Sequence, residues 1–160
     1  MKKLWPLVLL LAACTGSQEP SLPALVAAGS GEKVGFFRAK GLQGGAAALV
    51  ATWSASGLQD LAYAGAFRKL YLLFPDRLEA YATSDFNEAS VPQGSPVVRA
   101  LPADCTGGYL RLGQNRLLVH CPGAQKAFLL GLPDPGTPQE ADLTGLDPAA
   151  HLALLSLIHI

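Results

Sequence analysis

The chain has 160 residues, with 12 basic and 12 acidic side chains, so its formal net charge is zero. Half of the residues are hydrophobic and only 15% are charged, which excludes an intrinsically disordered chain, because disorder goes with low hydrophobicity and high charge. No basic patch is available to neutralise phosphates, so we expect no nucleic-acid partner.

Residues 1–13 have the organisation of a secretion signal. Two lysines follow Met1, and residues 4–13 form an uncharged, mainly apolar run. As a helix this run would be about 15 Å long against a hydrocarbon core of about 30 Å, so it is too short to span a membrane. Because the lysines stay on the cytoplasmic side, we expect the rest of the chain to be exported.

Leu11-Ala12-Ala13-Cys14 resembles the lipobox of bacterial lipoprotein precursors, in which an aliphatic and two small residues precede an obligatory cysteine. The resemblance implies cleavage between Ala13 and Cys14, a diacylglyceryl group on the Cys14 thiol, and acylation of the freed amine, for example by palmitate. Two or more acyl chains anchor a protein stably, whereas one holds it marginally. The alternative is an ordinary secretory signal in which Cys14 has no special role.

Residues 14–21 are expected to be the lipidated N-terminus and a flexible tether, because they are rich in small and polar residues. In bacteria with two membranes, the resemblance favours sorting to the outer membrane, since Thr15 and not aspartate follows Cys14; the outer face of the cytoplasmic membrane remains an alternative. Cleavage would leave 147 residues with 10 basic and 12 acidic side chains, a net charge of −2. This length suits one domain, which we place at residues 22–155.

The sequence of this domain predicts an all-β fold of antiparallel hairpins, because short extended segments alternate with turn residues and no stretch sustains a long helical period. The turns include Pro75-Asp76, Gly113-Gln114-Asn115 and Pro122-Gly123. The predicted strands are residues 22–27, 33–38, 47–53, 61–64, 69–74, 78–83, 97–101, 109–112, 116–121 and 126–130.

An internal repeat suggests how these strands are arranged. Shifted by 47 positions, residues 68–75 fall on residues 115–122, and Ala80-Tyr81 falls on Ala127-Phe128 without a gap. The segments 97–101 and 140–144 would close the two units. A period in the forties with about four strands resembles a β-propeller blade, so the chain would hold a partial propeller of two to three blades. The alternative is a small β-sandwich or barrel.

Cys105 and Cys121 remain once Cys14 is set aside, and we predict that they form a disulfide, because disulfides persist in exported proteins. The bond would stabilise the fold by about 3 kcal/mol on the chain-entropy model. Free thiols, or a metal site that also uses His120, are the alternatives. A metal site would lack the usual CxxC spacing and a fourth ligand, so we expect no metal.

The chain ends in an apolar run, and its last residues, 156–160, resemble the start of a translated adapter sequence. We therefore treat residues 156–160 as a doubtful tail and expect the domain to be truncated. The alternative is a genuine final strand or helix that packs into the core.

Catalytic sequence signatures such as G-x-S-x-G, H-E-x-x-H, G-x-G-x-x-G and the P-loop are missing from the sequence. His120, His151 and His159 are scattered, and we expect packed or surface roles for them. Asp85-Phe86-Asn87-Glu88 could offer oxygen ligands to a cation, but a solvated turn is the simpler interpretation. Trp53 and Tyr63 could line a binding surface, although aromatic residues in strands usually belong to the core.

These observations favour a non-enzymatic lipoprotein, with no cofactor, that binds or scaffolds other proteins outside the cytoplasm. Its expected partners are the membrane, through the lipid on Cys14, and another protein of the envelope. The main alternative is a fragment of an extracytoplasmic propeller enzyme of the hydrolase or lactonase kind. A third is a small-ligand carrier with a complete β-sandwich or barrel.

Overall fold

The computed structural model describes residues 25–43, 48–147 and 149–154, and β-strands are the main regular structure of this part of the chain. One short helix, α1 (Ala39–Gln43), and two 3₁₀ turns, Gly65–Phe67 and Pro122–Ala124, interrupt them. The strands are β1 (Leu25–Ser30), β2 (Lys33–Arg38), β3 (Leu49–Ser54), β4 (Asp60–Ala64), β5 (Lys69–Leu73), β6 (Arg77–Ala82), β7 (Val97–Ala100), β8 (Tyr109–Leu112), β9 (Arg116–Cys121), β10 (Lys126–Gly131) and β11 (Gln139–Asp142).

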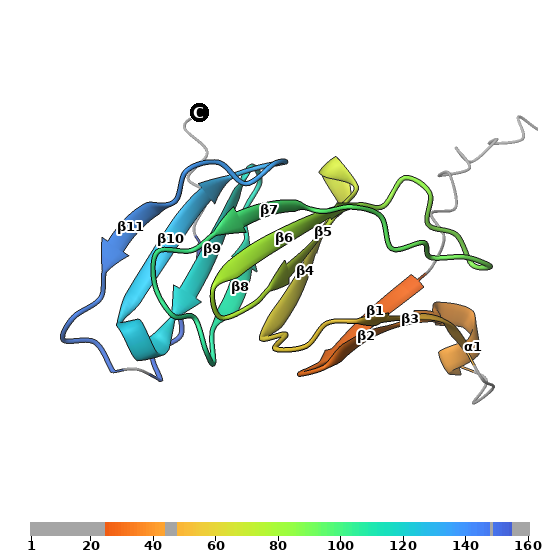
Figure 1. Ribbon diagram of the computed structural model, residues 1–160, viewed down its shortest axis with the longest axis horizontal. Helices are drawn as coiled ribbons and strands as arrows, with labels where there is room; N and C mark the ends of the chain where they lie inside the picture. Colours follow the sequence, from red (N-terminus) through yellow and green to blue (C-terminus); the bar gives the residue numbers. More distant parts are fainter. Residues whose placement is uncertain (1–24, 44–47, 148, 155–160) are drawn as a thin grey trace, which may run out of the picture.

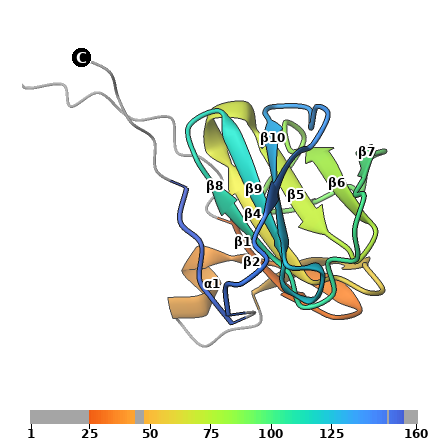
Figure 2. The ribbon, with the colours of Figure 1, turned by 90° about the vertical axis from the view of Figure 1, so that its left-hand side faces the viewer.

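The strands form three antiparallel sheets that follow one another along the chain (Figure 1). The first sheet has the order β1-β2-β3, the middle sheet β4-β5-β6-β7 and the last sheet β8-β9-β10-β11. Within each sheet every strand pairs with its neighbour in the sequence, so each sheet is a meander of hairpins. Figure 2, turned by 90°, places the last sheet in front of the middle one, which shows that the sheets are stacked.

The stacked sheets enclose two hydrophobic cores, one on each face of the middle sheet. The first core lies between the first and middle sheets, and the second lies between the middle and last sheets. In β5, alternate residues serve alternate cores: Leu70 and Leu72 belong to the first, Tyr71 and Leu73 to the second. Because both faces of β5 are buried, its sequence is a continuous apolar run and not an alternating one.

Aromatic side chains dominate the first core. The indole of Trp53 lies 4.6 Å from the ring of Phe36, 5.0 Å from Tyr81 and 5.5 Å from Phe86. Its Nε1 donates a hydrogen bond of 3.0 Å to the carbonyl oxygen of Val91, in the long connection between β6 and β7. Trp53 is therefore a core residue, and the polar atom of its ring is satisfied inside that core.

The second core is largely aliphatic and is bordered by polar bridges between the middle and last sheets. It contains Leu78, Leu110, Leu117, Val119, Phe128 and Leu130. At its border the Tyr71 hydroxyl donates a 2.6 Å hydrogen bond to the carbonyl oxygen of Pro133, and Lys69 pairs with Asp134 at 2.9 Å. Burial, with the nearby charge of Asp134, raises the pKa of Tyr71 to about 12, so the hydroxyl stays protonated as a donor.

The structure confirms the all-β class and contains every predicted strand, with most boundaries within two residues. The start of the first predicted strand, residues 22–24, lies outside the described residues, as do residues 1–21 and the tail 156–160. Helix α1 was not expected from the sequence. No helix in the described ranges is long and apolar enough to cross a membrane.

The middle and last sheets are equivalent strand by strand. Corresponding strands begin at Asp60 and Tyr109, Lys69 and Arg116, Arg77 and Lys126, and Val97 and Gln139. The cross-strand partners correspond as well, because Tyr81 lies opposite Leu70 just as Leu130 lies opposite Leu117. The repeat seen in the sequence is therefore a repeat of a whole four-stranded sheet.

The prediction that the two repeat units align without a gap, at a constant shift of 47 residues, is wrong. Ala80-Tyr81 corresponds to Leu129-Leu130 and not to Ala127-Phe128, a difference of two residues. The extra residues lie between β9 and β10, where the chain makes the 3₁₀ turn Pro122–Ala124. A shift of two residues keeps each side chain on the same face of the sheet, so the hydrophobic pattern gave no sign of the insertion.

Candidate functional site

The chain leaves the last strand of each sheet through the same kind of turn. In Ala55–Leu58, Cys105–Gly108 and Leu143–Leu146, the N–H of the fourth residue donates to the carbonyl oxygen of the first, at 3.1, 2.8 and 3.0 Å. The third residue is a glycine with a φ of 84°, 73° and 95° respectively. A positive φ at this position is what a type II turn requires, and glycine adopts it without a steric penalty.

A short sequence motif supports two of these turns. The Asp104 carboxylate accepts hydrogen bonds from the Thr106 hydroxyl at 2.7 Å and the Thr106 N–H at 3.0 Å. Asp142 accepts the same two bonds from Thr144. These bonds lower the pKa of both carboxyl groups. The shared pattern Asp-x-Thr-Gly was visible in the sequence but was not recognised there.

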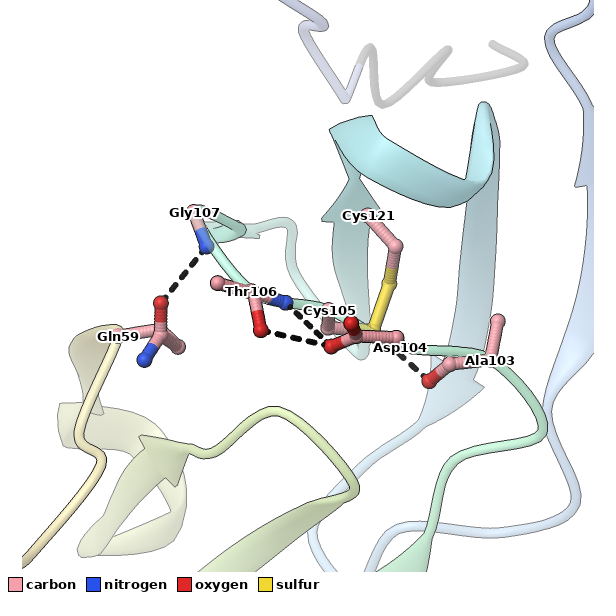
Figure 3. Close-up of a disulfide and its surroundings, with 7 residues drawn as sticks. All are labelled: Gln59, Ala103, Asp104, Cys105, Thr106, Gly107 and Cys121. Atoms are coloured by element: carbon pink, nitrogen blue, oxygen red, sulfur yellow. Dashed lines mark hydrogen bonds between the residues drawn. A yellow bond between two sulfur atoms is a disulfide. The ribbon is translucent and has the colours of Figure 1, made fainter.

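The predicted disulfide is present in the second of these turns (Figure 3). Cys105 and Cys121 are bonded, their Cα atoms are 4.2 Å apart, and both residues are fully buried. The bond fixes the connection between the middle and last sheets to the end of β9. Because a disulfide sulfur carries no hydrogen, the 3.6 Å approach of Cys105 Sγ to the carbonyl oxygen of Ala103 is a packing contact.

Two side chains at the start of β4, Gln59 and Asp60, also link the middle sheet to the chain around this turn. Gln59 Oε1 accepts a 2.7 Å hydrogen bond from the N–H of Gly107 (Figure 3). One oxygen of Asp60 accepts from the N–H of Leu110 in β8 at 2.7 Å, and the other accepts from Leu61 N–H at 2.8 Å. The middle and last sheets are thus joined by a polar bridge where the first strands of the two sheets begin.

A groove runs between β1 and β4 on the side of the first sheet; we call it the β1 groove. Near the β1–β2 turn it is a hollow of about 340 Å³, lined by Ala27, Gly29, Ser30, Gly31 and residues 58–61. Near the start of β1 it is a hollow of about 110 Å³, lined by Leu25, Ala27, Phe36, Tyr63, Leu70, Thr83 and Phe86. Ala27 lines both, so the groove follows β1 from a polar end to an apolar end.

His120 lies buried in β9, only 3% exposed, on the face of the last sheet away from the second core. Its ring is 4.7 Å from that of Tyr109, and its Nδ1 has no hydrogen-bond partner among the described residues. Burial, with a smaller contribution from the charge of His151, lowers the pKa of His120. The imidazole is therefore neutral near pH 7 and packs as an aromatic ring, the role expected from the sequence.

The chain after β11 packs over this face of the last sheet. The Tyr109 hydroxyl donates to the carbonyl oxygen of Ala150 at 3.3 Å and accepts from the N–H of Leu152. In Figure 2 this blue segment runs beside β8. Tyr109 corresponds to Asp60 in the repeat, and both side chains reach the backbone of the chain segment that follows their own sheet.

The structure also shows where the remaining candidate residues from the sequence lie. Tyr63 is half exposed and lines the β1 groove, so the expectation that it belongs to the core is wrong. In the 85–88 loop, the Asn87 side chain accepts from the N–H groups of Ala89 and Ser90, which is turn chemistry. Among the described residues, no group of three or more His, Cys, Asp or Glu side chains could hold a metal ion. Ala13 and Cys14 lie outside the described residues.

Comparison with known proteins gives a likeness of fold. A crystal structure of Hsv2 from Kluyvelomyces marxianus is similar to this chain, with a TM-score of 0.50 and 13% sequence identity. The similarity covers 76% of this chain and 46% of that protein, so the chain spans about half the length of Hsv2. No protein-family model and no curated protein matches the sequence.

Proposed function

We propose that this chain is a bacterial lipoprotein, anchored to a membrane of the cell envelope through Cys14, whose β domain binds or scaffolds other envelope proteins without catalysing a reaction. The observation that carries the proposal is the lipobox Leu11–Cys14 at the end of an uncharged apolar run that follows two lysines. The Cys105–Cys121 disulfide supports export, because such bonds persist outside the cytoplasm.

The domain is proposed to be a partial β-propeller of two to three blades. Three features support this architecture: each sheet is a meander, the sheets stack face to face in chain order, and each last strand leads into the same glycine turn. A stacked array of this kind offers strand edges and grooves between sheets as binding surfaces.

The tether and the β1 groove support a binding role. A lipid on Cys14 confines the domain to a membrane surface, which raises its effective concentration toward any partner held on that membrane. The β1 groove offers an exposed strand edge bordered by small residues, and strand edges bind extended peptide segments.

The proposal is tested by expressing the full chain in a diderm bacterium and separating the two membranes. We expect the wild-type protein in the outer membrane, and Thr15→Asp, a matched control that keeps Cys14, in the cytoplasmic membrane. Cys14→Ser, which lacks the thiol that carries the lipid, should be absent from the outer membrane. Amine-reactive crosslinking of intact cells should then capture an envelope protein with the wild type and capture less of it with Cys14→Ser.

Two results would overturn this proposal. If Cys14→Ser fractionates with membranes as the wild type does, the lipid anchor is wrong. If the anchored wild type yields no crosslinked partner that depends on Cys14, the binding role is wrong.

A further inference from the structure

The first sheet corresponds to the last three strands of the other two sheets. In each sheet, the residue that follows the final strand donates its N–H to the carbonyl oxygen just before the penultimate strand. These bonds are Ala55 to Glu32, Leu101 to Asp76 and Leu143 to Gln125, each 2.8 Å long. The strand pair β2-β3 therefore matches β6-β7 and β10-β11, and β1 matches β5 and β9.

This correspondence leaves the first sheet without a counterpart of β4 and β8 in the described residues. Antiparallel strands β4 and β8 lie beside β5 and β9, but among the described strands β1 pairs only with β2. Since Ser30 and Lys33 close a two-residue hairpin, they exchange both backbone bonds, and bonding alternates along β1. Leu25, Ala27 and Gly29 therefore turn their N–H and C=O groups to the open edge.

The β1 groove lies where a counterpart of β4 and β8 would lie beside β1. Its two hollows lie along β1 and β4 and share Ala27, so together they follow the edge for most of its length. The residues of β1 that face β4 are small there, because a Cβ on Gly29 would lie 2.6 Å from a methyl carbon of Leu58. An added strand would extend the stacking already made by β4 and β8.

The chain before β1 has a sequence unsuited to that place. In the middle and last sheets, connections of four and three residues separate the first strand from the second, and a four-residue connection before β1 would place the equivalent strand at residues 16–20. The corresponding segment is Gly16-Ser17-Gln18-Glu19-Pro20, which has no large apolar side chain, whereas β4 and β8 carry Leu61, Leu110 and Leu112 into the cores. Glycine, proline and glutamate are also poor strand formers.

We propose that the β1 groove binds an extended segment of another polypeptide, which adds to β1 as an antiparallel strand. This inference rests on the proposed binding function and names the class of partner. Because β4 is antiparallel to β1, the bound segment runs as β4 does, from the end near Asp60 to the end near Phe86. The partner segment therefore starts with a small or polar residue at the polar end of the groove, beside Gly29 and Gly31, and carries an apolar side chain three to five residues later, as strand spacing requires.

The test uses the full chain, purified from membranes in detergent, and a fluorescein-labelled peptide of residues 108–113, Gly-Tyr-Leu-Arg-Leu-Gly, the sequence of β8. We expect saturable binding by fluorescence polarisation, and none with the Leu110→Pro peptide. Hydrogen exchange at the amides of Ala27 and Gly29 should be fast in the free protein and slower when peptide is bound.

Two protein variants supply the matched comparison. Ala27→Pro removes an N–H from the open edge, and Val98→Pro does the same on β7, whose Val98 N–H points away from β6. The Ala27→Pro protein would lose one backbone hydrogen bond to the peptide, so its affinity for the peptide should fall about tenfold. The Val98→Pro protein keeps the β1 edge intact and should bind the peptide as the wild type does. Ala27→Phe, which fills the shared part of the groove, should also abolish binding.

Lack of binding by the wild type, equal binding by Ala27→Pro, or slow exchange at Ala27 and Gly29 in the free protein would each overturn the inference. The last result would mean that this chain fills its own edge. Because anchoring through Cys14 and crosslinking in cells are measured separately, these negative results would not contradict the proposed function. Conversely, a protein without a lipid anchor would not contradict strand addition at the β1 groove.

Discussion

The two boundaries of the middle sheet are held by different means. Between the first and middle sheets the side chains are mainly aromatic, with Trp53 at the centre. Between the middle and last sheets they are mainly aliphatic, and the connection is fixed by the Cys105–Cys121 disulfide and by hydrogen bonds of Gln59 and Asp60. The fold thus combines one boundary fixed by covalent and polar links with another that depends on ring packing.

The difference matters because the β1 groove lies at the boundary without the covalent link. Side chains of the first sheet make two hydrogen bonds to the β6–β7 connection, Arg38 Nε to Glu88 O at 2.9 Å and Trp53 Nε1 to Val91 O. Loss of ring packing should therefore release the first sheet while the other two stay together. Local stability follows the number and kind of contacts that hold each unit.

The largest effect is expected at Trp53. Trp53→Ala removes the side chain that contacts three other rings and the hydrogen bond to Val91, and should lower the free energy of unfolding by about 3–5 kcal/mol. Hydrogen exchange should show faster exchange in β1–β3 than in β8–β11. Tyr63→Ala, at a half-exposed ring, is the control and should cost far less. Equal acceleration in all three sheets would contradict the independence of the two boundaries.

Removal of the disulfide should have the next largest effect. The double variant Cys105→Ala, Cys121→Ala opens a link between residues 16 positions apart and should lower the unfolding free energy by about 3 kcal/mol. Urea unfolding followed by tryptophan fluorescence and by circular dichroism measures the loss. A double variant as stable as the wild type would show that packing and hydrogen bonds fix this boundary without the covalent link.

Asp60→Ala should have a smaller effect, about 1–3 kcal/mol, because it leaves the N–H of Leu110 without its acceptor at the edge of the second core. Asp76→Ala removes an exposed carboxylate that pairs with Arg77 and should cost less than about 1 kcal/mol. Thermal unfolding at one pH compares the two variants. Equal losses would mean that Asp60 acts only as a surface charge.

The smallest effect is expected from His120. Its pKa is lowered in the folded protein by burial and by the charge of His151, so the unfolded chain binds more protons as the pH falls below about 6.5. Stability should therefore decrease as the pH falls from 7 to 5. In the His120→Leu variant, the melting temperature should depend less on pH over this interval. Parallel melting curves for the two proteins would show that another group causes the acid sensitivity.

Much of the fold could be predicted from local sequence. The predicted strands 33–38, 109–112 and 116–121 have the observed boundaries, because turn residues flank clear apolar runs. The pairing of Cys105 with Cys121 could be predicted from their number and from the expected export of the chain. Helix α1 was missed, since its five residues are too few to show a helical period.

Other features depend on contacts that local patterns do not record. Tyr63 was expected in the core because it lies in a strand, yet no strand covers its side of the β1 groove among the described residues. The Lys69–Asp134 pair joins segments distant in sequence. The turns around Gly57, Gly107 and Gly145 could have been found from the Asp-x-Thr-Gly pattern, but Ser54 and Ser56 replace its polar residues in the first turn.

The most direct test of the central claim is the intact mass and N-terminal peptide mass of the protein extracted from bacterial membranes. The lipoprotein account predicts a chain that begins at Cys14, lacks residues 1–13, and carries a diacylglyceryl group on the thiol and an acyl chain on the amine. A mature protein with an unmodified Cys14, or one that begins at any other residue, would contradict it.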